Sequence, residues 1–212
     1  MAPSELPDGL YAITDGSLIP AAELVTRVAQ AIAGGATVIQ YREKQLAAGE
    51  RQQQAAALVE LCNCHGVPLL INDDVELAAA VGAAGIHLGK EDIAVRAARS
   101  RLGARAIIGV SCYNTLQRAQ AAAAAGADYV AFGRFFPSRT KPDAVQAETA
   151  LLAQARRELD LPLVAIGGIT PENGGTLLAA GANLLAVIHG VFGQPDVQAA
   201  AQHYKALFAI KR

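Results

Sequence analysis

Residues 162–180 read PLVAIGGITPENGGTLLAA, and this stretch contains the unit from which the whole chain is built. The apolar run from Pro162 to Ile166 has the length and branched composition of a buried β-strand. Two glycines follow it. Thr170 then offers an N-cap and Pro171 a first-turn proline, which predicts a helix from Pro171 to Ala180. The stretch therefore predicts a strand, a glycine-rich turn and a helix, in that order.

The same unit recurs along the chain. Strands are expected at Leu10 to Thr14, Thr37 to Arg42, Pro68 to Asn72, Gly85 to Leu88, Ala106 to Val110, Tyr129 to Gly133, Pro162 to Ile166 and Leu184 to Ile188. Helices are expected at Pro20 to Ala33, Glu50 to His65, Val75 to Val81, Ile93 to Leu102, Thr115 to Ala125, Ala147 to Leu159, Pro171 to Ala180 and Pro195 to Ala209. Strands that alternate with helices in this number predict a (β/α)8 TIM barrel.

The composition fits a single barrel domain over residues 1–212. Hydrophobic residues make up 52% of the 212 residues and charged residues only 17%, as expected for parallel strands covered on both faces. This balance excludes a disordered chain. A formal net charge of −1 gives no general attraction to nucleic acid or to an anionic membrane, so a small-molecule partner is favoured.

The amino terminus and the cysteines predict a cytoplasmic protein. Met1 to Glu5 lack the basic start and apolar run of a signal peptide, and no stretch is apolar for long enough to span a bilayer. Three cysteines argue against a disulfide framework. Cys62-Asn63-Cys64-His65 resembles a metal cluster, but residues two apart on a helix do not face each other, so ordinary thiols are expected.

Polar residues begin at the end of the second expected strand. In the sequence VIQYREK at 38–44, side chains alternate in direction, so Gln40, Arg42 and Lys44 should point into the barrel mouth while Tyr41 points toward the helices. Two cations that converge on one place suit a diphosphate. The alternative is that Arg42 only forms an ion pair with Asp73 or Asp92.

Two of these aspartates also predict a Mg²⁺ site. Asp73 follows the third expected strand and Asp92 the fourth. Each of Asp73, Asp74 and Asp92 could instead cap the next helix, and Asp73 and Glu76 have the spacing of a capping box. A pair of carboxylates beside two cations suits Mg²⁺, which takes few protein oxygens and completes its shell with water and substrate phosphates.

Three later clusters predict substrate-binding loops. The segment from Arg134 to Lys141 carries two hydroxyls and three cations, so it is expected to clamp substrate, although a merely solvated loop is the alternative. Gly167-Gly168 and Ile188-His189-Gly190 end the last two strands, where barrels bind phosphate through backbone N–H groups and a short helix.

Seven short motifs carry a family resemblance. In chain order they are QYREK at 40–44, NDD at 72–74, GIHLGKED at 85–92, GVS at 109–111, FPSRTK at 136–141, AIGGIT at 165–170 and AVIHG at 186–190. Together they resemble the successive motifs of the thiamine phosphate synthase family. The resemblance implies a Mg²⁺-dependent transferase that joins 4-amino-2-methyl-5-hydroxymethylpyrimidine diphosphate to a thiazole phosphate and releases diphosphate.

The resemblance also implies roles for residues at matching positions. The pyrimidine diphosphate would be held by Gln40, Tyr41, Arg42, Glu43, Lys44, Asn72, Ser111 and Lys141. The thiazole phosphate would be held by Ser138, Arg139, Thr140, Gly168, Ile188 and His189. Asp73 and Asp92 would bind the metal. Arg42, Lys44 and Lys141 would also stabilise the charge that builds on the departing diphosphate.

Some positions depart from the family pattern. Lys90 stands where the family often has Gln, Ser138 where Thr is common, and His189 where Ser is frequent. Tyr113 stands where this family and the related thiazole tautomerases often have His, which disfavours a tautomerase.

Two other functions stay open on the residues alone. A thiazole tautomerase-like barrel would bind only the thiazole phosphate and would leave the carboxylates and the Gln-x-Arg-x-Lys strand unused. A non-catalytic sensor of a phosphorylated metabolite would need only the phosphate site. The roles of Glu43 and His87 are open as well, because an interior histidine is as often a hydrogen-bonded core residue as a functional one.

Overall fold

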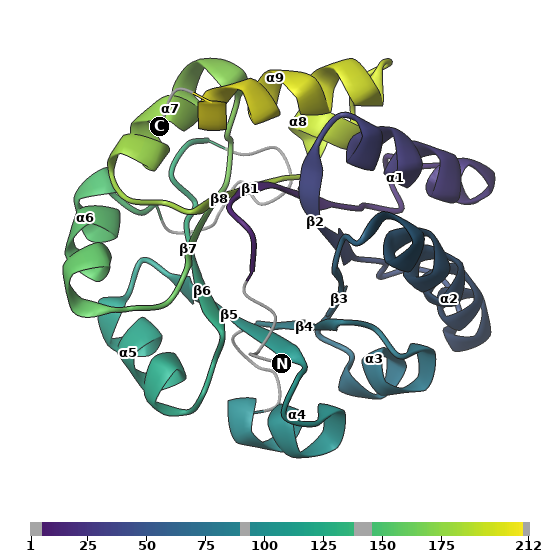
Figure 1. The fold of residues 1–212 in the computed structure, drawn as a ribbon, viewed down its shortest axis with the longest axis horizontal. Coiled ribbons are helices and arrows are strands. Elements are labelled where there is room, and N and C mark those ends of the chain that lie inside the picture. Colours follow the sequence, from purple (N-terminus) through teal and green to yellow (C-terminus); the bar gives the residue numbers. More distant parts are fainter. Residues whose placement is uncertain (1–5, 90–93, 138–145, 210–212) are drawn as a thin grey trace.

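The computed structural model describes residues 6–89, 94–137 and 146–209. Within these ranges, eight parallel strands pair in chain order and close into a barrel, and the helices surround it (Figure 1). The predicted (β/α)8 TIM barrel is therefore confirmed. In the same ranges, no helix combines the length and the apolar character needed to cross a membrane.

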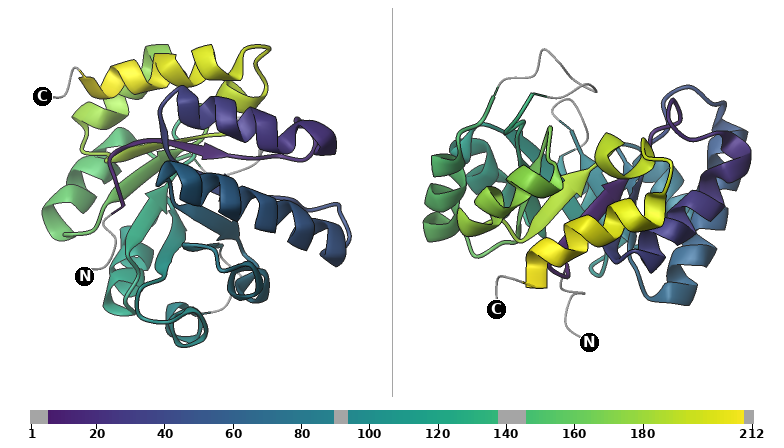
Figure 2. Two further views of the ribbon diagram at one scale, coloured as in Figure 1. Left: turned by 45° about the vertical axis from the view of Figure 1, so that its right-hand side comes forward. Right: turned by 90° about the horizontal axis from the view of Figure 1, so that it is seen from above.

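The strands are β1 (Gly9–Ile13), β2 (Ala36–Tyr41), β3 (Leu69–Asn72), β4 (Gly85–Leu88), β5 (Ile107–Tyr113), β6 (Tyr129–Phe132), β7 (Leu163–Ile166) and β8 (Leu184–Val187). The helices are η1 (Ala21–Glu23), α1 (Leu24–Ala33), α2 (Ala48–His65), α3 (Val75–Val81), α4 (Val95–Leu102), α5 (Leu116–Ala124), α6 (Thr149–Glu158), α7 (Pro171–Ala179), α8 (His189–Phe192) and α9 (Val197–Ala209). Helix α9 packs against both α1 and α7, which closes the outer ring (Figure 2).

Two boundaries differ from the sequence prediction in ways that concern the site. Strand β5 runs on to Tyr113 instead of ending at Val110, because it keeps pairing with β6 across a register shift between Ser111 and Tyr113. Ser111 therefore lies within a strand. The short helix α8 was not among the predicted helices, and it begins at His189, directly after β8.

The strands are buried on both faces, as the alternation predicted. Side chains directed into the barrel form one cluster, which includes Tyr11, Val38, Leu70, Tyr129 and Val164. Their sequence neighbours, such as Leu10, Ile39 and Ile71, pack against the helices in a second cluster. Because direction alternates strictly along each strand, Gln40 and Tyr41 belong to opposite layers.

Polar anchors join neighbouring strands at their amino ends. The Asp128 carboxylate precedes β6, accepts a hydrogen bond from the Ile108 N–H at 2.7 Å, and pairs with Arg99 of α4 at 2.6 Å. The Asn183 side chain precedes β8 and accepts from the Leu163 N–H of β7 at 3.0 Å. Each anchor satisfies a strand N–H that the sheet ladder leaves unpaired.

We expect Asp128→Ala to lower the free energy of unfolding by about 1 to 3 kcal/mol, because it removes the acceptor of a strand N–H and the partner of Arg99. Urea unfolding followed by circular dichroism measures this change. Glu76→Ala is the control, since it breaks the exposed pair with Arg101 and should barely move the midpoint. Equal effects of the two variants would show that Asp128 is no anchor.

Candidate functional site

A cavity of about 940 Å³ opens at the carboxyl ends of the strands. All eight strands contribute to its wall, through Tyr11, Gln40, Asn72, His87, Ser111, Ala131, Ile166 and Val187 in strand order. This is the end at which (β/α)8 barrels carry their active sites.

Most of the sequence-predicted site residues that the structure describes meet in this cavity. Those on its wall are Gln40, Arg42, Lys44, Asn72, Asp73, Ser111, Gly168, Ile188 and His189. They come from motifs that span most of the chain. The fold brings them together because each follows or ends a strand of the barrel, as the sequence predicts.

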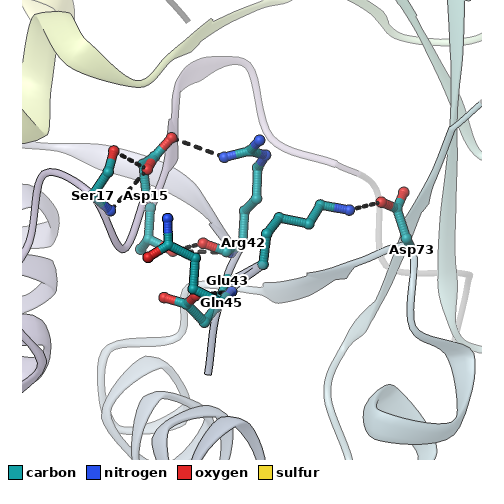
Figure 3. A network of polar contacts seen from close by, with 8 residues as sticks. Asp15, Ser17, Arg42, Glu43, Gln45 and Asp73 are labelled. Atoms are coloured by element: carbon teal, nitrogen blue, oxygen red, sulfur yellow. Dashed lines mark hydrogen bonds and ion pairs between the residues drawn. The ribbon is translucent and has the colours of Figure 1, made fainter. Parts of the chain in front are cut away.

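Arg42 is held at the rim by residues that follow β1 (Figure 3). Its guanidinium donates to the Asp15 carboxylate at 2.8 Å, and its backbone N–H donates to the Thr14 hydroxyl at 2.9 Å. The other Asp15 oxygen accepts from the Ser17 hydroxyl at 2.6 Å and the Ser17 N–H at 3.0 Å. The predicted alternative pairing of Arg42 with Asp73 is wrong, because Asp15 takes that place.

The surroundings of Asp15 keep it ionised. Burial raises the pKa of its carboxyl, but the hydrogen bonds from Ser17 and the charge and hydrogen bond of Arg42 outweigh burial, so the net pKa is lowered. A depressed folded-state pKa gives stability above the unfolded pKa and loses it as the pH falls. At neutral pH, Asp15 therefore stays an anion and orients Arg42.

Lys44 forms an ion pair with Asp73, whose carboxylate is labelled at the end of a dashed contact in Figure 3. Its ammonium donates to the Asp73 carboxylate at 2.5 Å, and both side chains are partly exposed. Asp73 has φ 65°, in the left-handed region that aspartate tolerates better than most residues. Its backbone N–H donates to the His87 carbonyl at 2.9 Å, which ties this turn to β4.

The capping role belongs to Asp74. Its carboxylate accepts from the Leu77 N–H at 2.9 Å as the N-cap of α3, and it pairs with Arg51 at 3.3 Å. A capping box from Asp73 to Glu76 is therefore wrong, because the helix begins one residue later than that spacing requires. The Asp73 carboxylate is directed at a cation on the cavity rim instead.

Asp73 fits a Mg²⁺ site as a single carboxylate ligand. Across the described ranges, no three His, Cys, Asp or Glu side chains group as a metal site. A site with few protein ligands still suits Mg²⁺, which keeps several waters and takes phosphate oxygens from its substrate. Asp92, the other predicted ligand, lies outside the described residues.

A chain of hydrogen bonds crosses the floor of the cavity. The Gln40 amide donates to the Tyr11 hydroxyl at 2.6 Å, and the Tyr11 and Tyr129 hydroxyls are 2.9 Å apart. The two His87 ring nitrogens lie 2.8 Å from the Tyr129 hydroxyl and 2.9 Å from the Ser111 hydroxyl. Burial raises the pKa of both tyrosines, so their hydroxyls stay protonated.

The glycine turn after β7 is packed against the segment after β6. Gly168 has φ 63°, and a Cβ there would overlap the Pro137 carbonyl and the Phe136 backbone. The Phe136 N–H donates to the Gly167 carbonyl at 3.1 Å. The two glycines thus allow the segment that carries Pro137 to lie at the cavity wall. The sequence predicts them only for the close approach of a phosphate.

The last strand leads directly into the short helix α8. Ile188 and His189 line the cavity, and α8 begins at His189. A short helix after the eighth strand is a common phosphate-binding element of these barrels.

Some predicted residues are not brought to the wall. The Tyr41 hydroxyl donates to Gln54 in the helix layer at 2.8 Å. The Glu43 carboxylate accepts from the Gln45 and Leu46 N–H groups at 2.6 and 3.3 Å, away from the cavity. The predictions at Asp92, Ser138, Arg139, Thr140 and Lys141 concern residues outside those that the structure describes.

Sequence reasoning missed three residues of the site. Asp15 follows β1, whose end carries no run of charges that would mark it as a site. Its role comes from the ion pair with Arg42, which lies far from it in the sequence. Tyr11 and Tyr129 sit inside apolar strands, and no role is predicted for them from the sequence. Their hydroxyls were the available signal, because a buried tyrosine hydroxyl needs a polar partner.

Comparisons with known proteins agree with this geometry. The family described as thiamine monophosphate synthase matches residues 10–191. The chain is 54% identical over 200 residues to the thiamine-phosphate synthase of Nitrosococcus oceani, covering 94% of this chain and 92% of that protein. It is 52% identical over 208 residues to that of Marinobacter nauticus, covering 97% and 93%.

A solved structure agrees as well. Thiamine phosphate pyrophosphorylase from Pyrococcus furiosus matches with a TM-score of 0.88 and 33% identity, over 99% of this chain and 98% of that one. With a family match along most of its length and relatives that share half of its residues, the chain belongs to the thiamine monophosphate synthase family.

Proposed function

We propose that this cavity joins 4-amino-2-methyl-5-(diphosphooxymethyl)pyrimidine to 4-methyl-5-(2-phosphooxyethyl)thiazole, giving thiamine phosphate and diphosphate. Family membership makes the chain a transferase of thiamine-phosphate synthesis. One observation supports the assignment of sites most: two cations that follow β2 and a carboxylate that follows β3 line a cavity whose wall also carries the glycine turn after β7 and the start of α8.

On the β2 side, the proposed occupant is the pyrimidine diphosphate. Arg42 and Lys44 would hold the diphosphate and stabilise the charge that grows on it as the C–O bond breaks. Asn72 and Ser111 would add hydrogen bonds, and Gln40 would face the pyrimidine. The aminopyrimidine can delocalise the positive charge left on its methylene carbon, so the protein need not supply a strong base or nucleophile.

Asp73 and Asp92 are the proposed holders of Mg²⁺, which when bound would add positive charge beside the departing diphosphate. Lys44 has a second task in this arrangement. Because its ammonium binds the Asp73 carboxylate, it keeps that side chain at the rim, next to where the diphosphate would lie. Lys141 is proposed to bind the diphosphate as well.

On the β7 and β8 side, the proposed occupant is the thiazole phosphate. Backbone N–H groups of Gly168, Ile188 and His189 would hold the phosphate, together with Ser138, Arg139 and Thr140. A phosphate anchored there would leave the thiazole nitrogen in the cavity, close to the methylene carbon. The thiazole nitrogen would then capture the pyrimidine cation before water does, because it is already held close to the methylene carbon.

The proposed partners are small molecules. The proposed protein is a single cytoplasmic domain over residues 1–212. The net charge of −1 supports a partner other than nucleic acid or a membrane. The three cysteines, of which Cys62 and Cys112 are buried and Cys64 is exposed, are all free thiols. That state supports a reducing compartment.

Incubation of the protein with both substrates should release diphosphate and form thiamine phosphate in equal amounts, and only when Mg²⁺ is present. A coupled phosphate assay and chromatography measure the two products. The same experiment separates the rival functions. Binding of the thiazole phosphate without diphosphate release would favour a sensor, and conversion of a thiazole isomer alone would favour a tautomerase.

Asp73→Asn should lower kcat on the order of a hundredfold and raise the Mg²⁺ concentration needed for half-maximal rate, because a ligand charge is lost. Asparagine tolerates a positive φ, so the turn should stay intact. The neighbouring variant Asp74→Ser keeps a helix cap and should retain activity. An Asp73→Asn enzyme with normal Mg²⁺ dependence would remove Asp73 from the metal site.

Asp15→Asn should lower kcat/KM for the pyrimidine diphosphate by roughly tenfold, because a neutral amide orients the Arg42 guanidinium less firmly. Steady-state kinetics with the thiazole phosphate held saturating measures this. Glu23→Gln breaks a comparable carboxylate–guanidinium pair with Arg27, at 2.7 Å on the surface, and should leave the kinetics unchanged. Unaltered kinetics in Asp15→Asn would mean that Asp15 does not position Arg42.

A further inference from the structure

Packing holds Tyr129 firmly in the hydrogen-bonded chain on the cavity floor. Tyr129 is fully buried, and its ring occupies the space that a Cβ at Gly109 would fill. The Tyr129 ring also stacks on His87, with ring centroids 5.6 Å apart and an interplanar angle of 23°. The Tyr129 hydroxyl is thereby fixed between the Tyr11 hydroxyl and the His87 Nδ1 atom.

The Gln40 amide sets the direction of the protons along this chain. Because Gln40 Nε2 donates to the Tyr11 oxygen, the Tyr11 proton is directed to the Tyr129 oxygen. The Tyr129 proton is then directed to His87 Nδ1. Each hydroxyl in the series accepts one hydrogen bond and donates the next.

The direction continues to the cavity wall. With Nδ1 as acceptor, neutral His87 carries its proton on Nε2 and donates it to the Ser111 oxygen, 2.9 Å away. Ser111 lines the cavity, so its own proton is left to point toward a ligand there. A reversed Gln40 amide would invert every bond and place the histidine proton on Nδ1.

We infer that Tyr129 is a positioning residue, which acts through the Nε2–H tautomer of His87 to present the Ser111 hydroxyl as a hydrogen-bond donor to an anionic oxygen of the substrate. His87 then serves as a donor to Ser111, so the pair does not act as base and nucleophile. The catalytic part of this inference rests on the proposed function, in which that oxygen belongs to the diphosphate. The tautomer does not depend on it.

The tautomer is tested without substrate by long-range ¹H–¹⁵N correlation of the imidazole groups at mildly alkaline pH. The chain has four histidines, and the His87 signals are those that His87→Asn removes. We expect the Nε2–H pattern for His87. Tyr129→Phe should lower the share of the Nε2–H tautomer, because Nδ1 loses the hydrogen bond from Tyr129.

Tyr11→Phe is the matched control for the spectra. It removes one buried hydroxyl from the same chain but leaves the Tyr129 proton with His87 Nδ1 as its acceptor, so the Nε2–H pattern should persist. An Nδ1–H pattern in the unaltered protein would overturn the inference, as would a His87 spectrum that Tyr129→Phe leaves unchanged.

Kinetics test the route through Ser111. Tyr129→Phe should lower kcat about tenfold and Ser111→Ala on the order of a hundredfold, with little change in KM for the thiazole phosphate. In the double variant, the Tyr129 change should cost nothing further, since the donor it orients is gone. If the two losses of kcat multiplied in the double variant, Tyr129 would not act through Ser111 and the inference would be overturned. Complete inactivity of the unaltered protein with an Nε2–H tautomer would instead refute the proposed function and leave the tautomer assignment standing.

Discussion

Closure of parallel strands into one barrel is the constraint on which the rest of this structure depends. All strands run in the same direction, so their carboxyl ends open on one rim, and residues from distant motifs meet there without any specific attraction between them. The apolar side chains inside the barrel and beneath the helices stabilise that closure. The closed barrel in turn positions the polar residues at the rim.

Charge at the rim is organised in pairs. Arg42 is matched by Asp15 and Lys44 by Asp73, so neither cation stands partly buried without an answering carboxylate. Such pairs are weak contributors to stability where they are exposed. Their effect is on geometry: they hold two cations and one carboxylate close to the place where the proposed leaving group would gather negative charge.

Polar groups in the barrel interior follow a stricter rule. An unsatisfied buried hydroxyl or amide is costly, and in the part of the chain that the structure describes no buried side-chain nitrogen or oxygen lacks a hydrogen-bond partner. Gln40, Tyr11, Tyr129 and His87 meet this requirement by bonding to one another in a line that ends at Ser111. The same line connects the floor of the cavity to Ser111 on its wall, so the bonds that satisfy the buried groups also fix the position of the Ser111 hydroxyl.

The sequence by itself determined the order of strands and helices, the rim at which the polar residues gather, and which residues at the end of β2 face the cavity. It could do so because side-chain direction alternates with a period of two and helices follow each strand, both of which are local rules. Tertiary structure alone decided that Arg42 pairs with Asp15, that Asp74 rather than Asp73 caps α3, and that two tyrosines join His87 to Gln40. Those outcomes depend on distances between strands far apart in the chain, set by barrel register and packing, and no local pattern encodes them.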